Sequence, residues 1–421
     1  MTGPRRYAVV VDPLSTGQEY PAAFRDAGVE TVAVLSRAEP VPTFRASWHP
    51  ENFRHIHVYD GDMDALAATL RTYDPICVIA GSEVGVELAE ALVERVLPGR
   101  GHAPRLATAR YDKWAMSQAL REAGVARLRQ ICTADPAEVD RWLTETGQQG
   151  GRLVLKPPRS CATDNVHIAG PGQDWRPLFD QVYGAVNLLG ERNDAVLVQE
   201  FAAGTEFMID TYSTGGRHGL VDVCRYTKSQ RGDRLGVYDL VDFVRPEHPD
   251  VAAVWPYAQQ VLDAVGVRNG CAHTEIIVTP QGPRFIDVGA RPAGGGHQMI
   301  TELATGTNQI RRHVAHLARG EFTDSYDLVQ RVCSVVISAP RGGVWRNAEL
   351  FADVGKLATY HVEHFYYATG DVVPPAGALF DMLGWVVLAS TDVEAVEADY
   401  RQIKDLERRI EVDPVQSVGA G

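Results

Sequence analysis

The segment HTEIIVTPQGPRFIDVGARPAGGGH, residues 273–297, decides the fold of the chain. Its two apolar runs flank the sequence PQGP at 280–283, a pattern that predicts two strands joined by a short turn. Because side chains alternate between the faces of a strand, we expect Glu275 and Asp287 to share one face. Two carboxylates suit a hard cation such as Mg²⁺, and the guanidinium of Arg291 suits phosphate oxygens. The segment therefore indicates a metal-nucleotide site, with a surface hairpin carrying scattered charges as the alternative.

Composition narrows the class of protein. A chain of 421 residues with 45% hydrophobic and 23% charged residues is typical of a globular protein with two to four domains or lobes. Its net charge of −13 argues against nucleic acid as a partner, since phosphate-backbone binding needs a basic surface. No apolar run is long enough for a signal peptide or a membrane span, so we expect a cytoplasmic protein without a membrane partner.

Lysine is rare in this chain. Only five of the 41 basic residues are lysines, and the others are arginines. The lysines are Lys113, Lys156, Lys228, Lys356 and Lys404. In so arginine-rich a chain, a lysine can mark a place where a compact point charge is needed, although we expect chance placement for Lys356 and Lys404.

Residues 1–106 alternate short β-branched runs with helical patterns, which predicts an open parallel α/β domain. Neither GxGxxG after the first strand nor GxxxxGK[ST] occurs, so no dinucleotide fingerprint or Walker loop is present. Glu83 follows a strand at the edge where open sheets bind ligands, and it is a candidate to hold a substrate amine. A first-turn acid in a helix capped by Ser82 is the alternative.

Residues 107–200 predict a linking helix followed by a small α+β lid, with one helix expected over 175–189. Lys156 ends a strand, and the loop after it offers the Ser160 hydroxyl and backbone N–H groups that can cover a polyphosphate. A solvated lysine at a strand end is the alternative. The hinge Gln199-Glu200-Phe201 can read an adenine edge through its backbone, and Glu206 can accept hydrogen bonds from ribose hydroxyls. A purely structural turn is equally compatible with this hinge.

We expect a catalytic subdomain over residues 201–325 and a C-terminal α+β lobe over residues 326–421. Residues 342–390 are rich in short strands and turns, and a last helix has apolar residues at the spacing of one buried face. The sequence leaves the oligomeric state open, with a homodimer as one alternative.

Taken in chain order, one series of residues resembles the ATP-grasp superfamily over roughly residues 105–320. The series is Asp112-Lys113, Lys156, Gln199-Glu200-Phe201, Gly204-Thr205-Glu206, Lys228, Glu275, Asp287 and Arg291. The resemblance implies an ATP-grasp fold with an N-terminal open parallel α/β domain, a small α+β lid and a larger α+β C-terminal domain. It implies ATP and Mg²⁺ as cofactors, as one ion or two, with Mn²⁺ as an alternative.

The resemblance also assigns roles. Lys113 and Lys156 would contact the nucleotide phosphates, Lys228 a further phosphate, and Arg291 the transferred phosphoryl group. Adenine would lie at the hinge, and Glu275 and Asp287 would hold the Mg²⁺.

Within the superfamily, the segments RYDKWAMSQALREAGV, AHTE and GARPAGGGH look like L-amino acid ligases of dipeptide and peptide-antibiotic biosynthesis. These ligases join small carboxylic acids and amines through an acyl phosphate and release ADP and phosphate. Two features depart from the usual pattern. Asp287-Val288-Gly289 replaces Glu-x-Asn, and the phosphate loop is poor in glycine.

The glycine loop after Arg291 is the candidate amino-acid site. Gly295 and Gly296 allow a backbone to approach a ligand closely, and His297 can donate to a carboxylate. His273 is a further candidate for this pocket, although we favour a histidine satisfied within the core at that position.

Two rival functions remain. One is a ligase or carboxylase of primary metabolism, such as the biotin- or purine-linked members of the superfamily. The other is a nucleotide-binding regulatory protein without turnover.

Overall fold

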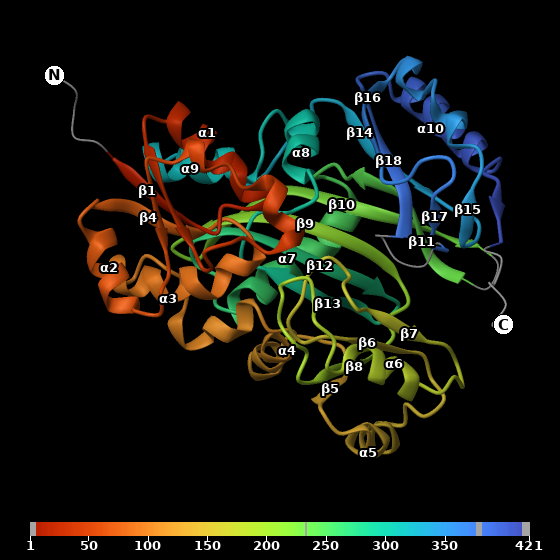
Figure 1. Ribbon diagram of the computed structural model, residues 1–421, viewed down its shortest axis with the longest axis horizontal. Helices are drawn as coiled ribbons and strands as arrows, with labels where there is room; N and C mark the ends of the chain where they lie inside the picture. Colours follow the sequence, from red (N-terminus) through yellow and green to blue (C-terminus); the bar gives the residue numbers. More distant parts are fainter. Residues whose placement is uncertain (1–5, 232–233, 376–380, 415–421) are drawn as a thin grey trace, which may run out of the picture.

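The computed structural model describes residues 6–231, 234–375 and 381–414. Within these ranges the strands form four sheets (Figure 1). Among the described residues, no helix combines the length and the apolar character needed to cross a membrane.

The first sheet is parallel, with the strand order β3-β2-β1-β4. Its strands are β1 (Tyr7–Val11), β2 (Glu30–Leu35), β3 (His55–Val58) and β4 (Pro75–Ala80), accompanied by helices α1 (Tyr20–Asp26), α2 (Met63–Arg71) and α3 (Val86–Val96). Helices α2 and α3 pack on one face. The other face packs on α1 and on a helix from much later in the chain, α9 (Gln309–Arg319).

The lid is a four-stranded antiparallel sheet with the order β5-β8-β6-β7. Its elements are β5 (Gln130–Thr133), α5 (Pro136–Thr146), β6 (Leu153–Lys156), β7 (His167–Ala169), α6 (Arg176–Val182) and β8 (Val196–Glu200). The helix expected over 175–189 ends earlier, at Val182, because Gly184 has a φ of +77° and the chain then turns. Helix α4 (Lys113–Glu122) links the lid to the first domain.

The large sheet has eight strands in the order β13-β12-β9-β10-β11-β14-β18-β16. Its strands are β9 (Thr205–Thr214), β10 (Arg217–Arg231), β11 (Arg234–Phe243), β12 (Gly270–Thr279), β13 (Gly282–Gly289), β14 (Arg331–Ser338), β16 (Tyr360–Phe365) and β18 (Met382–Ser390). The expected hairpin is therefore present as β12 and β13.

Alternation along these strands separates two environments. Phe207, Ile209 and Ile276 point to the core formed with α4 and α7 (Pro249–Ala264). Met208 faces the opposite side, toward α8 (His297–Thr305). The residues of the candidate site lie on this second face.

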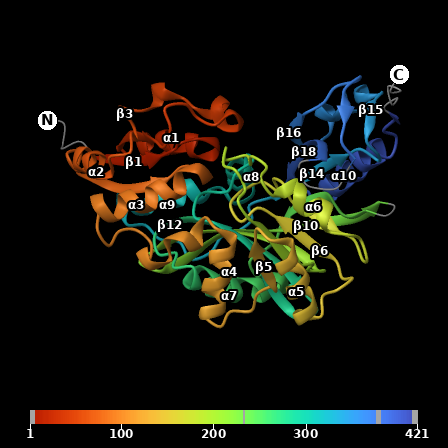
Figure 2. The same cartoon turned by 60° about the horizontal axis from the view of Figure 1, so that its bottom comes forward.

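The C-terminal lobe extends the large sheet through β14, β18 and β16 and adds a small sheet of β17 (Val372–Val373), β15 (Gly343–Trp345) and β19 (Val412–Asp413). Helix α10 (Val393–Glu407) buries Val396 and Ile403 against it, as the spacing predicts. In Figure 2 the first domain and the C-terminal lobe lie on opposite sides of the molecule, with the lid in front.

Candidate active site

Strand pairing sets the two acidic residues of the hairpin side by side. Glu275 on β12 is directly opposite Asp287 on β13, so the two acids share one face as expected. Side chains of directly opposite residues start about 5 Å apart, close enough to share one cation. In the register set by the turn, Glu275 would lie opposite Ile286. A β-bulge between Glu275 and Ile276 shifts the pairing by one residue and brings Asp287 opposite Glu275 instead.

Two lysines approach this pair from different elements. Lys113 begins α4 after Asp112, whose side chain caps the helix, and its Nζ lies 3.0 Å from Asp287 Oδ2. Lys156 ends β6 with only 5% of its surface exposed, and its Nζ lies 3.5 Å from the Ile286 carbonyl oxygen. The lid and the linking helix thus bring one positive charge each to the β13 end of the sheet.

The two lysines differ electrostatically. Burial alone would lower the pKa of Lys113, but the carboxylates of Asp287 and Glu83 outweigh it and raise that pKa. Burial and the charge of Lys113 lower the pKa of Lys156 to about 8. Lys156 is therefore a buried cation whose positive charge is only partly offset by neighbouring carboxylates. Such a group is suited to bind an anion.

Glu275 is held ionised by a neighbouring histidine. His273 Nε2 lies 3.7 Å from Glu275 Oε1, and its Nδ1 lies 2.7 Å from Asp210 Oδ1. Burial opposes both charges, but the acids raise the pKa of His273 to about 10, and His273 lowers the pKa of Glu275 to about 2. His273 is thus satisfied within the core.

Arg291 reaches across to the first domain. Its Nε donates to Glu83 Oε2 at 2.8 Å, and a second guanidinium nitrogen donates to the Pro292 carbonyl oxygen at 3.0 Å. A Cβ at Gly289 would lie 3.1–3.3 Å from three guanidinium atoms of Arg291. Glycine at 289 therefore leaves room for the arginine to lie over the strand end.

The expected nucleotide residues of the hinge are engaged with protein partners. Glu206 forms an ion pair with Lys228 and accepts hydrogen bonds from the Tyr238 hydroxyl at 3.2 and 3.3 Å. The Glu200 carboxylate accepts from the backbone N–H and Nε of Arg129, both at 2.8 Å. The Phe201 N–H donates to the Arg152 carbonyl oxygen at 3.3 Å.

The loop after Lys156 lies over Lys113. The Lys113 Nζ donates to the Ser160 carbonyl oxygen at 2.6 Å, and the Ser160 hydroxyl donates to Asp164 at 2.7 Å. Ala162 and Thr163 have φ values of +61° and +55°, a conformation that costs non-glycine residues energy and is often found at functional sites. The loop is therefore held in place by Lys113, one of the two lysines expected to contact phosphate.

This combination of a two-acid hairpin, paired lysines and an antiparallel lid agrees with the comparisons to known proteins. Residues 150–302 match the ATP-grasp domain family. The chain carries an ATP-grasp domain.

Similarity to individual proteins extends over nearly the whole chain. This chain is 28% identical over 411 residues to dapdiamide A synthase from Enterobacter agglomerans, with 95% of each protein covered. The structure resembles an L-amino acid ligase from Bacillus licheniformis, with a TM-score of 0.68 at 16% identity over 99% of this chain and 100% of that one. It also resembles N5-carboxyaminoimidazole ribonucleotide synthetase from Thermotoga maritima, with a TM-score of 0.62 at 16% identity, covering 97% and 100%. The two structural likenesses show the fold.

The glycine loop of the ATP-grasp domain packs against the first domain. Gly295 and Gly296 have φ values of +64° and +76°, where a Cβ would be strained. The Thr16 hydroxyl donates to the Ala293 carbonyl oxygen at 2.7 Å. His297 lies buried at the start of α8, with Nε2 3.3 Å from Asp222 Oδ1. Gly295 and Gly296 therefore have open space beside them, whereas His297 is engaged by Asp222.

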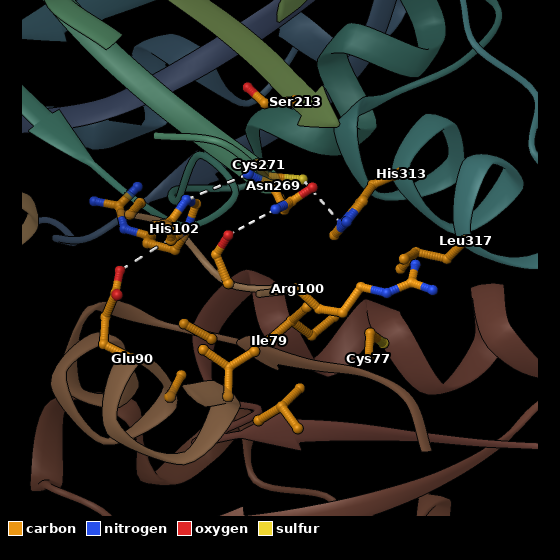
Figure 3. Close-up of a pocket in the computed structure, with 18 of the residues that line it drawn as sticks. Cys77, Ile79, Glu90, Arg100, His102, Ser213, Asn269, Cys271, His313 and Leu317 are labelled. Carbon is orange, nitrogen blue, oxygen red and sulfur yellow. Dashed lines mark hydrogen bonds and ion pairs between the residues drawn. The ribbon is translucent and has the colours of Figure 1, made fainter. Parts of the chain in front are cut away.

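A pocket lies between the first sheet and the ATP-grasp domain (Figure 3). Edge strand β4 lines one side, and His102, Cys271 and His313 line another. Burial lowers the pKa of both histidines to about 3, so their imidazoles are neutral. The segment Ala290–Pro292 forms part of the wall, which places the cavity behind Arg291.

The structure adds two acids that the sequence reading missed, Asp210 and Asp222. Both are fully buried in the middle of apolar strands. The available signal was an acid inside each of the runs FMIDTY and LVDVC, since ionisable residues are rarely buried without a partner.

Proposed function

We propose that this ATP-grasp protein is an ATP-dependent carboxylate-amine ligase, which joins an amino acid or similar small acid to an amine. The observation that carries the proposal is the meeting of Glu275, Asp287, Lys113, Lys156 and Arg291 at one boundary between the large sheet, the lid and the first domain. The likeness to dapdiamide A synthase over 95% of both chains supports an amide-forming reaction.

The acidic pair fits a divalent cation. Glu275 and Asp287 offer only carboxylate oxygens, the ligands that Mg²⁺ prefers, and they face one another on neighbouring strands. At Gly289 no side-chain ligand exists, and the guanidinium of Arg291 fills the adjoining space. We therefore assign one Mg²⁺, or Mn²⁺ in its place, to this pair. When bound, the ion neutralises charge on the phosphates of ATP.

The lysines of the site act on the nucleotide. Lys156 lacks a close carboxylate in the described chain and gains one counter-charge when a phosphate arrives. Lys113 exchanges Asp287 and the Ser160 carbonyl oxygen for phosphate oxygens. When ATP binds, the ion pair between Lys228 and Glu206 opens, so that Lys228 contacts a phosphate and Glu206 accepts from the ribose hydroxyls. The adenine lies against the hinge at Glu200 and Phe201.

Arg291 and Glu83 act on the reacting acid and amine. A carboxylate oxygen of the substrate attacks the γ-phosphorus of ATP, and ADP leaves. The amine then attacks the acyl carbon, and phosphate leaves. Arg291 lies where it can meet the negative charge that grows on the acyl phosphate, and its Glu83 partner supplies a carboxylate for the substrate ammonium group. Positioning and charge neutralisation account for most of the expected acceleration.

The test is phosphate release from ATP and Mg²⁺ with amino acids supplied singly and in pairs, followed by mass spectrometry of the products. We expect release that depends on both an acid and an amine, with a product mass equal to their sum minus water. ATP binding without any substrate-dependent release would refute the proposal and leave a nucleotide-binding regulatory protein. Release that depends on bicarbonate would identify a carboxylase instead.

A further inference from the structure

Two fully buried acids face each other beneath the active site. Asp210 on β9 and Asp222 on β10 are direct cross-strand partners, and neither has measurable exposure. Like charges directly opposite on paired strands repel each other, and a buried charge is costly unless it is paired. Cationic groups beside the pair would offset this repulsion.

Two histidines meet these acids. His273, the cross-strand partner of Asp210 on its other side, places Nδ1 2.7 Å from Asp210 Oδ1. His297 places Nε2 3.3 Å from Asp222 Oδ1 and 3.5 Å from Asp210 Oδ2. Asp210 is therefore the acid that contacts both imidazoles.

The orientation of His297 is set from two further sides. Its ring stacks on Phe243 with centroids 5.6 Å apart and planes 4° from parallel. The hydroxyl of Thr301, one turn along α8, donates to Asp222 Oδ2 at 2.9 Å. Buried polar contacts from His297 and Thr301 to Asp222 thus anchor the start of α8 to the sheet. The same contacts give the buried acid polar partners.

Each end of this buried chain reaches a different part of the candidate active site. At one end, His273 Nε2 lies 3.7 Å from Glu275 Oε1, the cation ligand proposed above. At the other end, His297 is the first residue of α8 and directly follows the loop Gly294–Gly296. Asp210 lies between the two ends.

We infer that Asp210 is a positioning residue that orients Glu275 through His273 and anchors the glycine loop through His297. The inference rests on the proposed function, because it takes Glu275 as a cation ligand and the loop as an amino-acid site. Groups that hold a metal ligand from behind typically change metal affinity by about 10- to 100-fold when they are removed. Asp210 contacts Glu275 only through His273, so we expect an effect at the lower end of that range.

The experiment compares Asp210→Asn with Asp222→Asn. The two acids are equally buried in the same network, but in the described structure only Asp210 contacts His273. Asparagine keeps the shape of aspartate but removes the negative charge that lies beside both imidazoles. Binding of Mn²⁺ in the presence of a non-hydrolysable ATP analogue, followed by the electron paramagnetic resonance signal of free Mn²⁺, reports on Glu275 without turnover.

We expect Asp210→Asn to weaken Mn²⁺ binding by about 10-fold and Asp222→Asn by less than about 3-fold. Both variants should raise the KM for an amino-acid substrate, since both loosen His297. Mn²⁺ binding by Asp210→Asn at the parent affinity would overturn the inference. Equal weakening in the two variants would overturn it as well, because it would indicate a general loss of structure.

His273→Asn provides a second variant that interrupts only the branch from Asp210 to Glu275. It should weaken Mn²⁺ binding and leave the amino-acid KM near the parent value. If Asp210→Asn does not give a cooperative thermal transition, unchanged Mn²⁺ binding by His273→Asn decides against the inference. A parent enzyme that releases no phosphate with any substrate would refute the proposed function, whereas the Mn²⁺ comparison would still decide the role of Asp210.

Discussion

Replacing Lys156 with methionine should make the ligand-free protein more stable while it weakens ATP binding. Lys156 is 5% exposed, and its pKa is lowered from 10.5 to about 8 by burial and by the charge of Lys113. Each pKa unit corresponds to about 1.4 kcal/mol, so the charged form destabilises the folded protein by about 3 kcal/mol at neutral pH. Methionine has a similar length and no charge, and so avoids that cost.

The size of the effect is measurable by thermal unfolding without nucleotide. A gain of about 3 kcal/mol raises the Tm of a chain of this size by roughly 2 to 6 °C. With saturating ATP analogue and Mg²⁺ the order should reverse, because the parent gains binding energy that the variant lacks. We expect ATP affinity to fall by more than about 10-fold, beyond the ~0 to 1 kcal/mol typical of an exposed ion pair.

The pH dependence has a definite sign. Because the folded pKa of Lys156 is about 8 and its ordinary value is 10.5, the unfolded chain holds this proton more tightly between those two values. The free energy of unfolding contributed by this group therefore rises with pH over that window and is constant below it. The difference in stability between the methionine variant and the parent should shrink as the pH increases from 8 to 10.5.

Lys113→Met is the matched control. Lys113 is paired with Asp287 at 3.0 Å and donates to the Ser160 carbonyl oxygen, and its pKa is raised. Its removal leaves a carboxylate and a carbonyl without their donor, so this variant should lose both stability and ATP affinity. A Lys156→Met protein that melts below the parent, or that binds ATP with the parent affinity, would refute the reasoning.

The remaining predictions concern the reacting groups and the lid. Arg291→Ala should abolish product while ATP binding, measured by calorimetry, stays largely intact; product formation at the parent rate would place the phosphoryl site elsewhere. His297→Ala should raise the KM for an amino acid more than the KM for ATP in steady-state kinetics, because it frees the glycine loop from Asp222, and equal KM changes would count against that role. Hydrogen exchange across residues 156–165 should slow when ATP analogue and Mg²⁺ are added, and identical exchange in both conditions would exclude lid closure.

Local pattern determined much of this protein. Two apolar runs about a short turn specified a hairpin, because side chains on a strand alternate with a period of two residues. The register that sets Glu275 opposite Asp287 depends on a β-bulge, which alternation alone did not specify. The position of Lys156 at a strand end, and the buried face of the last helix, also follow from contacts between residues near in sequence.

Only the tertiary structure decided what surrounds that hairpin. Strand β9 lies between β10 and β12, so Asp210 meets Asp222 on one side and His273 on the other. Arg291 meets Glu83 from another domain, and α9 covers the first sheet although more than 200 residues separate them. Periodicity reports which face of an element is apolar but carries no information on which distant element will cover it. Burial and charge pairing across the whole fold select those partners. Both depend on contacts between residues far apart in sequence, which form only when the chain folds.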